Sequence, residues 1–149
     1  MRYADDLPYW KTSQSSPDVW MERTVNLIFN YGGIIISQLA GTISGKTGYM
    51  IIFRVGEDTF RISWPVSQSK KDETRAAKVQ AATMMHHDIK AKLITAEVFG
   101  TRAAFFSYLL LPDGRTASEA SVPELQNEIP SLFLVNQLTD VVDGEYIEE

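Results

Sequence analysis

Cysteine is absent from this chain of 149 residues, which excludes disulfide bonds, thiolate metal sites and cysteine nucleophiles together. A long apolar run is also missing, because no stretch approaches the ~18 residues of a membrane span. The first residues, Met1 to Asp6, are acidic and lack the apolar core of a secretion signal. We therefore expect a cytoplasmic protein that does not enter a membrane.

Basic charge is scarce as well. The formal net charge of −5 argues against a protein that coats nucleic acid with its whole surface, since phosphate binding needs clustered lysine and arginine. Residues 139–149 hold five acidic residues and no basic one, so the remainder is close to neutral. We expect a partly ordered N-terminal arm over 1–15, a single α+β domain over 16–136 and an acidic tail over 137–149 that solubilises the chain, mimics nucleic acid or binds a basic partner.

Two helices are predicted from their ends. Ser16-Pro17-Asp18 combines a capping hydroxyl, a first-turn proline and an acid, and Gly32-Gly33 ends the amphipathic run that follows. Ser69-Lys70-Lys71-Asp72 has the form of a capping box, so we expect the second helix to begin at Ser69. Neither glycine nor proline interrupts residues 73–98, and Gly100 is expected to end this long helix.

Three antiparallel strands are predicted between these helices. The first runs from Ile34 to about Ala40, and 41–48 reads as a polar loop. Apolar alternation over 49–55 and 60–66, around Gly56-Glu57-Asp58, indicates a β-hairpin. The alternation places Tyr49, Phe53, Phe60 and Trp64 on the covered face and Arg54, Arg61 and Ser63 on the other. Pro65 is expected at a strand end or a sheet edge.

The C-terminal third is less regular. Residues 101–111 fit either a short helix or a strand, and 111–116 read as a turn. Another short helix is expected over 122–129, followed by an apolar segment at 132–135 that docks. The fold class is therefore α+β, with a helix, a three-stranded antiparallel sheet, a long helix and short C-terminal helices.

A basic cluster at the expected start of the long helix is the main candidate site. Lys71, Arg75 and Lys78 share one helix face, where free N–H groups and the helix dipole would favour phosphate. The exposed sheet face and the loop before it would widen this site. The candidate nucleic-acid-binding residues are Lys46, Arg54, Arg61, Lys70, Lys71, Arg75 and Lys78. The alternative interpretation is a solvated helix face whose lysines pair with neighbouring acids.

Other chemistry finds little support. His86 and His87 are adjacent and point ~100° apart on a helix, which is not the four-residue spacing of a shared metal. The segment 41–47 ends in Gly-Lys-Thr, but only three residues separate its glycines and a strand follows it, unlike a phosphate-binding loop. We expect no catalytic residue, metal or cofactor.

One resemblance runs over residues 17–120. It is carried by the Phe53-Arg54 and Trp64-Pro65 strands, the segment from Lys90 to Phe99 and the run from Phe106 to Thr116. These parts resemble a family of small phage and prophage proteins. The acidic run usual in that family is missing at 101–104. The resemblance implies a phage-related origin and carries over no active site, because the family has no settled biochemical role.

A second resemblance is one of topology. Helix, three antiparallel strands and helix is the order of the double-stranded-RNA-binding domain, and Ser69-Lys70-Lys71 with Arg75 and Lys78 is similar to the lysine cluster of that domain. The sheet and long helix also resemble single-strand-annealing proteins. We therefore expect a small non-enzymatic accessory protein that binds nucleic acid. The alternative is a protein-interaction module, such as a complex subunit, an inhibitor of a host system or a homo-oligomer.

Overall fold

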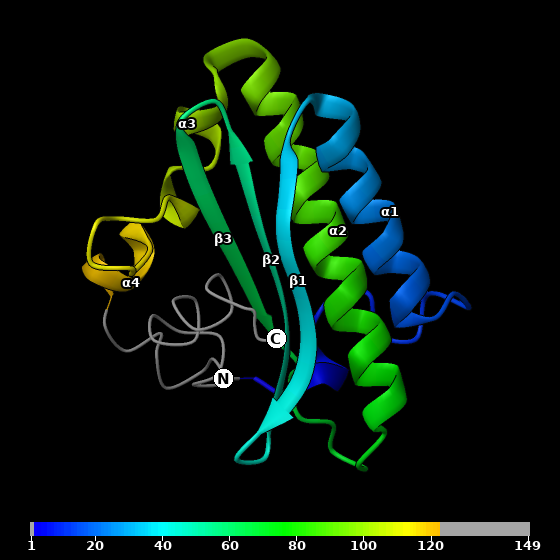
Figure 1. Cartoon of the computed structure of the whole chain (residues 1–149). Helices are drawn as coiled ribbons and strands as arrows, with labels where there is room; N and C mark the ends of the chain where they lie inside the picture. Colours follow the sequence, from blue (N-terminus) through cyan, green and yellow to red (C-terminus); the bar gives the residue numbers. More distant parts are fainter. Residues whose placement is uncertain (1, 123–149) are drawn as a thin grey trace.

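The structure is a computed structural model that describes residues 2–122, and it confirms the α+β class (Figure 1). Helices α1 (Pro17–Tyr31) and α2 (Thr74–Phe99) lie side by side on one face of a sheet with strand order β1-β2-β3. The strands are β1 (Ile34–Ile43), β2 (Lys46–Val55) and β3 (Asp58–Pro65), and both pairings are antiparallel. The predicted helix over 122–129, the apolar segment 132–135 and the tail 137–149 lie outside the described residues, save for Val122.

Helix α1 begins and ends where the sequence predicts. The Ser16 hydroxyl accepts a hydrogen bond from the Val19 N–H at 3.3 Å, and Gly32 ends the helix with φ +112°, which favours glycine. Gly33 then passes so close to the helix that an added Cβ would lie 2.7 Å from Cγ2 of Ile28. The tight exit lets β1 begin directly beside α1.

The loop expected over 41–48 is instead part of the sheet. Strands β1 and β2 continue to Ile43 and Lys46, and a two-residue turn of Ser44 and Gly45 joins them. Both turn residues have positive φ, +53° and +79°, as in a type I′ turn. The predicted hairpin of β2 and β3 is confirmed, with Phe53 paired with Phe60 and a turn at Gly56-Glu57.

The core lies between the sheet and the two helices. Phe53 and Phe60 stack with centroids 5.3 Å apart, and Phe105 meets Phe53 edge-on at 5.3 Å. Ile28 from α1 and Ile89 from α2 are fully buried in the same cluster. The predicted covered face, with Tyr49, Phe53, Phe60 and Trp64, is therefore confirmed.

Helix α2 begins five residues later than the capping-box pattern predicts. Its first residue is Thr74, and the hydroxyl of Ser69 accepts from the nearby N–H of Lys71 at 3.2 Å rather than capping a helix. Asp72 has φ +54°, a left-handed conformation that no helix accommodates. The prediction was wrong because a local hydroxyl turn gives the same sequence pattern as a helix cap. Gly100 ends α2 as predicted.

The N-terminal arm is an ordered segment packed on α2. It contains a short 3-10 helix, η1 (Ala4–Asp6), and the Ala4 N–H donates to the Gln68 carbonyl at 2.8 Å. The buried amide of Gln80 donates to the carbonyls of Ala4, Leu7 and Pro8 at 2.8, 3.3 and 2.9 Å. A single side chain of α2 therefore holds much of this segment.

The chain after α2 crosses to the outer edge of β3. It forms α3 (Thr101–Ala104), a 3-10 turn η2 (Phe106–Tyr108) and α4 (Ala117–Ser121). Between η2 and α4, the Leu110 N–H donates to the Thr59 carbonyl at 2.9 Å, and Leu109 bridges Phe60. Residues 101–111 thus contain both helical turns and an isolated bridge, and the predicted turn at 111–116 is present.

Candidate functional site

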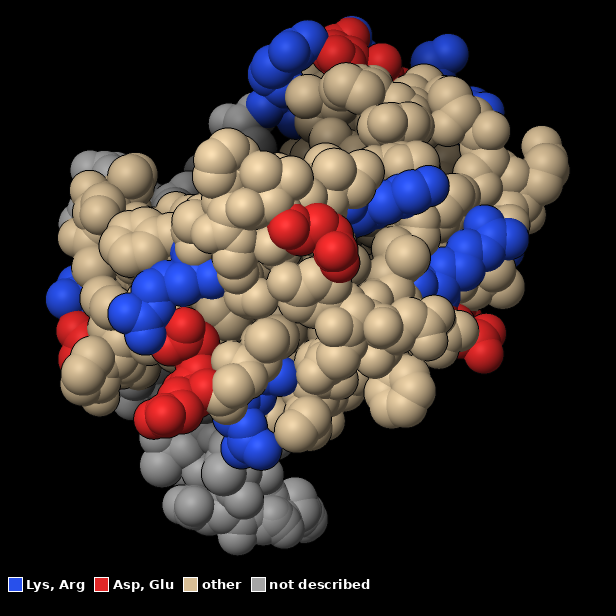
Figure 2. Space-filling model, turned by 90° about the horizontal axis from the view of Figure 1, so that it is seen from above, with Lys and Arg blue, Asp and Glu red and all other residues tan. Residues whose placement is uncertain are grey.

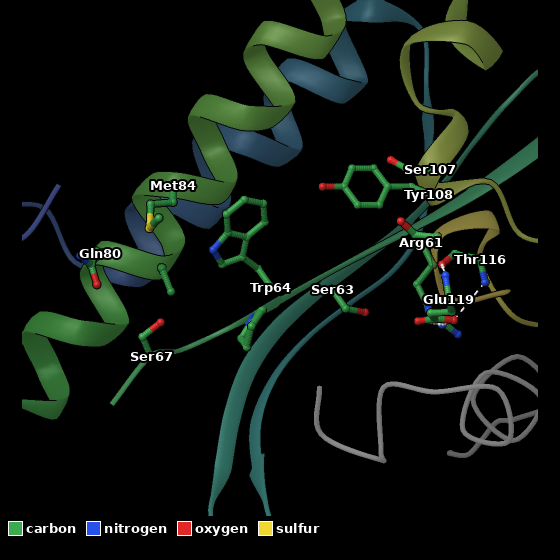
Figure 3. Close-up of a pocket in the computed structure, with 13 residues that line it drawn as sticks. Arg61, Ser63, Trp64, Ser67, Gln80, Met84, Ser107, Tyr108, Thr116 and Glu119 are labelled. Atoms are coloured by element: carbon green, nitrogen blue, oxygen red, sulfur yellow. Dashed lines mark hydrogen bonds and ion pairs between the residues drawn. The ribbon is translucent and has the colours of Figure 1, made fainter. Parts of the chain in front are cut away.

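A cavity of about 360 Å³ opens at the outer edge of β3, between α2 and the segment that carries η2 and α4. Its volume falls within the ~300–1,000 Å³ typical of ligand sites. Figure 3 shows Trp64 extending toward Met84 of α2, while Arg61 lies on the α4 side of the strand. The described residues that line the cavity come from β3 and its extension (Arg61, Ser63, Trp64, Pro65, Ser67), from α2 (Gln80, Ala81, Met84) and from the C-terminal segment (Ser107, Tyr108, Thr116, Ser118, Glu119).

The wall on the α4 side contains a buried ion pair. Nη2 of Arg61 donates to both carboxylate oxygens of Glu119, and the two side chains are 0% and 3% exposed. Nη1 of Arg61 donates to the Gly114 carbonyl at 3.3 Å. Because the opposite charges compensate each other, this wall is polar without carrying net charge.

Glu119 is positioned by the start of α4. Its carboxylate accepts from the Thr116 N–H at 3.0 Å, and the Thr116 hydroxyl accepts from the Glu119 N–H at 3.1 Å. These two bonds form a capping box, which orients the carboxylate before it meets Arg61. A short helix of five residues thus acquires a defined place against the sheet.

Two polar atoms at this wall lack hydrogen bonds. Nε of Arg61 and the hydroxyl of Ser63 are buried, and neither has a partner within the described part of the chain. A buried donor without an acceptor costs about 1–3 kcal/mol. Such groups are rare in folded proteins, and they occur at sites of binding as well as at sites of strain.

The side of the cavity near α2 is more apolar. Trp64, Ala81 and Met84 contribute rings, a methyl and a thioether, and Tyr108 lies across from them (Figure 3). The Tyr108 hydroxyl donates to Asp88 at 2.9 Å, and Asp88 also pairs with Lys92 at 2.9 Å. Burial, with the Asp88 charge as a lesser cause, raises the pKa of Tyr108 far above its usual value, so its phenol stays a neutral donor.

The two histidines are structural. His86 is buried, and its Nδ1 lies 3.1 Å from the hydroxyl of Thr24, which itself donates to the Trp20 carbonyl at 2.8 Å. Since a hydroxyl has one proton, Nδ1 of His86 donates to Thr24. His87 stacks on Tyr9 with centroids 4.7 Å apart. The expected exposed or boundary position thus holds for His87 and is wrong for His86. Over residues 2–122, no three His, Asp or Glu side chains gather to hold a metal ion.

The predicted basic cluster is divided. Lys70 and Lys71 precede α2 instead of lying on it. Lys70 pairs with Asp6 at 3.0 Å, and this hydrogen bond raises the pKa of Lys70. Arg75 and Lys78 are exposed on α2, as predicted, but they line different depressions: Arg75 lies with Lys11 and Glu73, whereas Lys78 lies with Thr47 and Thr74.

The sheet arginines do not join that cluster. Arg61 was expected to be exposed, but its side chain is buried against Glu119. Arg54 is exposed, yet it lies near the opposite end of β2 from Lys46, about 27 Å away at ~3.4 Å per residue. At the end of the molecule where α1 and α2 finish, positive and negative side chains are interspersed, with no continuous area of one sign (Figure 2).

One gathering of positive charge was not predicted. Arg2 and Lys46 line a depression beside the β1–β2 turn, and Lys78 lines a second depression. The two depressions share wall residues (Gly45, Thr47, Val66, Gln68), so they adjoin. Arg2 was missed because the arm shows no regular pattern that would place it beside the sheet.

The cavity residues were also missed. Sequence periodicity assigns Trp64 to the covered face of the sheet and does not show that space remains beside it. Thr116-x-x-Glu119 has the spacing of a capping box, which would have placed an acid at a helix start. Only the fold shows that Arg61 lies opposite that acid.

No protein family, curated protein or solved structure matches this chain. The resemblances to phage proteins, to double-stranded-RNA-binding domains and to single-strand-annealing proteins stay predictions. Among the helices of residues 2–122, none has the length and apolar character needed to cross a membrane.

Proposed function

We propose that this chain is a binding module whose principal site is the cavity at the β3 edge. One observation carries the proposal: a buried, charge-compensated pair of Arg61 and Glu119 faces apolar side chains across an open volume of about 360 Å³. A cavity with apolar walls and a few placed polar groups is the usual form of a ligand site. The occupant is uncharged where it meets this wall, because the guanidinium is already neutralised by Glu119.

The interaction-module alternative from the sequence fits this site better than a catalytic role. Titratable groups near the cavity are engaged in structural bonds: Glu119 with Arg61 and Thr116, and Tyr108 with Asp88. The Tyr108 phenol, with its raised pKa, serves as a hydrogen-bond donor rather than as a base.

A screen of small apolar and aromatic fragments by ligand-observed NMR tests the proposal. Fragments should bind the parent protein and should not bind the Ser107→Trp variant, because the new indole would fill the cavity next to Tyr108. Thr95→Trp is the matched control, because Thr95 is exposed on α2 and does not line the cavity. Fragments that bind all three proteins equally, or none of them, would contradict the proposal.

Polyanion binding is a second candidate, and it is supported by the adjoining depressions that hold Arg2, Lys46 and Lys78. Threonine and serine hydroxyls and the Gln68 amide also line these depressions and suit phosphate oxygens, whereas the Asp72 carboxylate in the Lys78 depression opposes an anion. This site differs from the predicted basic cluster at the start of the long helix, because it contains Arg2 and does not contain Arg54 or Arg61.

Fluorescence titration with single- and double-stranded oligonucleotides at low salt tests this second candidate. Arg2→Glu with Lys78→Glu should abolish micromolar binding, and the affinity of the parent should fall steeply with salt. Lys71→Glu with Arg75→Glu is the matched charge control and should retain most of the binding. Equal loss in both double variants would instead indicate a response to total charge.

A further inference from the structure

The backbone of β3 presents an edge at the cavity that residues 2–122 pair only in part. In an antiparallel ladder, the N–H and C=O of one residue point to the same side, and successive residues alternate. The Thr59 carbonyl accepts from Leu110, on the side away from β2, while the Val66 N–H donates to Thr47 of β2. Arg61 and Ser63 alternate in phase with Thr59, so their backbone groups also point away from β2.

The chain itself already adds a strand to the upper part of this edge. Leu109 bridges Phe60 in antiparallel orientation, and Leu110 donates to Thr59 at 2.9 Å. The same register would place residue 106 opposite Ser63, but Phe106 begins the turn η2 and leaves the edge. No described residue therefore pairs with the outward backbone groups of Ser63.

The cavity occupies the place where that pairing stops. Arg61, Ser63 and Pro65, which follow one another along the outward side of β3, all line it. Pro65 has no N–H, so it ends the usable edge. The free length is therefore short and centres on the outward N–H and C=O of Ser63.

From these relationships we infer that the cavity receives an extended peptide segment of a partner protein, which pairs with β3 and inserts one apolar side chain. The inference rests on the proposed function of the same cavity. Strand addition satisfies the outward backbone groups of Ser63, which no residue of 2–122 pairs, and an inserted side chain contacts Trp64, Ala81 and Met84. The inserted side chain is uncharged, because Arg61 is already compensated by Glu119.

Selection from a displayed random heptapeptide library on the full chain provides the probe. The enriched peptide, labelled with a fluorophore, should bind the parent with micromolar affinity and shift the amide resonances of Ser63 and Trp64 in ¹⁵N spectra. It should contain one large apolar residue flanked by residues that favour extended structure.

Two variants at one position separate backbone pairing from side-chain contact. Ser63→Pro removes the outward N–H and should weaken the peptide at least tenfold, whereas Ser63→Ala keeps the N–H and should change affinity less than threefold. Because that N–H does not bond β2, the sheet should tolerate the proline. If Ser63→Pro fails to fold, N-methylation of the peptide replaces it: methyl groups on amides that face β3 should weaken binding tenfold, and methyl groups on alternate amides should not.

The outcomes distinguish the inference from the proposed function. If fragments bind the cavity but no peptide is selected, or if Ser63→Pro and N-methylation leave the affinity unchanged, strand addition is overturned and the cavity stays a small-molecule site. If neither fragments nor peptides are blocked by Ser107→Trp, both proposals fail. A concentration-dependent dimer that is abolished by Ser107→Trp would show a second copy as the occupant and would overturn a partner peptide.

Discussion

Arg61 and Glu119 lie 58 residues apart in the chain, and their side chains form an ion pair that is almost wholly removed from solvent. Arg61 belongs to the central part of β3, and Glu119 belongs to the first turn of α4. The pair fixes the C-terminal segment against the sheet and forms one wall of the cavity.

Removing one partner of this pair should be costly. Glu119→Ala leaves the Arg61 guanidinium buried without its counter-charge, so we expect the free energy of unfolding to fall by about 3–5 kcal/mol. Urea denaturation followed by circular dichroism measures the change. Asp113→Ala is the control, because it breaks a solvent-exposed pair with Arg115 on the neighbouring turn and should leave the denaturation midpoint close to that of the parent. A loss below about 1 kcal/mol for Glu119→Ala would contradict the structural role of the pair.

Replacing both members tests the same pair from the other side. The double variant Arg61→Met with Glu119→Leu buries no charge and should recover most of the stability lost in Glu119→Ala. Equal destabilisation of the single and double variants would show that the capping of Thr116 by Glu119, rather than the ion pair, is the main contribution.

Gly33 should not tolerate a side chain. A Cβ at this position would lie 2.7 Å from the Ile28 side chain and 3.1 Å from the Ile28 carbonyl oxygen, so Gly33→Ala forces α1 and β1 apart. We expect a loss of about 1–3 kcal/mol in the free energy of unfolding. Gly41→Ala is the matched control, since nothing lies within 4 Å of its added Cβ. Similar thermal midpoints for the two variants would refute the close approach.

His86 should make the protein less stable in mild acid. Burial, aided by the charges of His87, Lys90 and Arg23, lowers the pKa of His86 below its ordinary value of 6.5. As the pH falls through 6.5, the unfolded chain takes up a proton that the folded chain does not, so unfolding becomes more favourable. The contribution is therefore fully present above pH 6.5 and is lost below it.

Urea midpoints at pH 7.5 and pH 5.5 measure this effect. The parent should lose stability between the two values, and His86→Gln should lose less, whereas His87→Gln should keep the dependence that His86 causes. An identical pH profile for the parent and His86→Gln would rule out this histidine as the source.

Gln80 should control the order of the N-terminal segment. Its amide is buried and donates to three carbonyls between Ala4 and Pro8, so Gln80→Leu removes a donor from each of them, although the Ala4 carbonyl still accepts from the Leu7 N–H. Hydrogen–deuterium exchange followed by mass spectrometry should show faster exchange over residues 2–11 with little change in β2. Gln38→Leu, at an exposed position of β1, should leave this exchange unchanged. Equal protection in Gln80→Leu would mean that the Ala4–Gln68 bond suffices.

Local patterns in the sequence determined the class of fold and most of its elements. Ser16, Gly32 and Gly100 mark helix ends because their preferences act within one turn, and the alternation around Gly56 predicts the β2–β3 hairpin because a pleat has a period of two. The start of α2 was misplaced, since Ser69 forms a local turn that has the same pattern as a cap.

Only the tertiary structure decided what surrounds each side chain. Arg54 and Arg61 share one face of the sheet, yet one is exposed and the other is buried, because α4 brings Glu119 to Arg61. The cavity likewise depends on the path of the chain at the β3 edge. Leu109 pairs with Phe60, whereas Phe106 belongs to the turn η2 and does not continue this pairing. Burial and pairing between distant segments depend on how the whole chain packs, so the periodicity of a single element does not predict them.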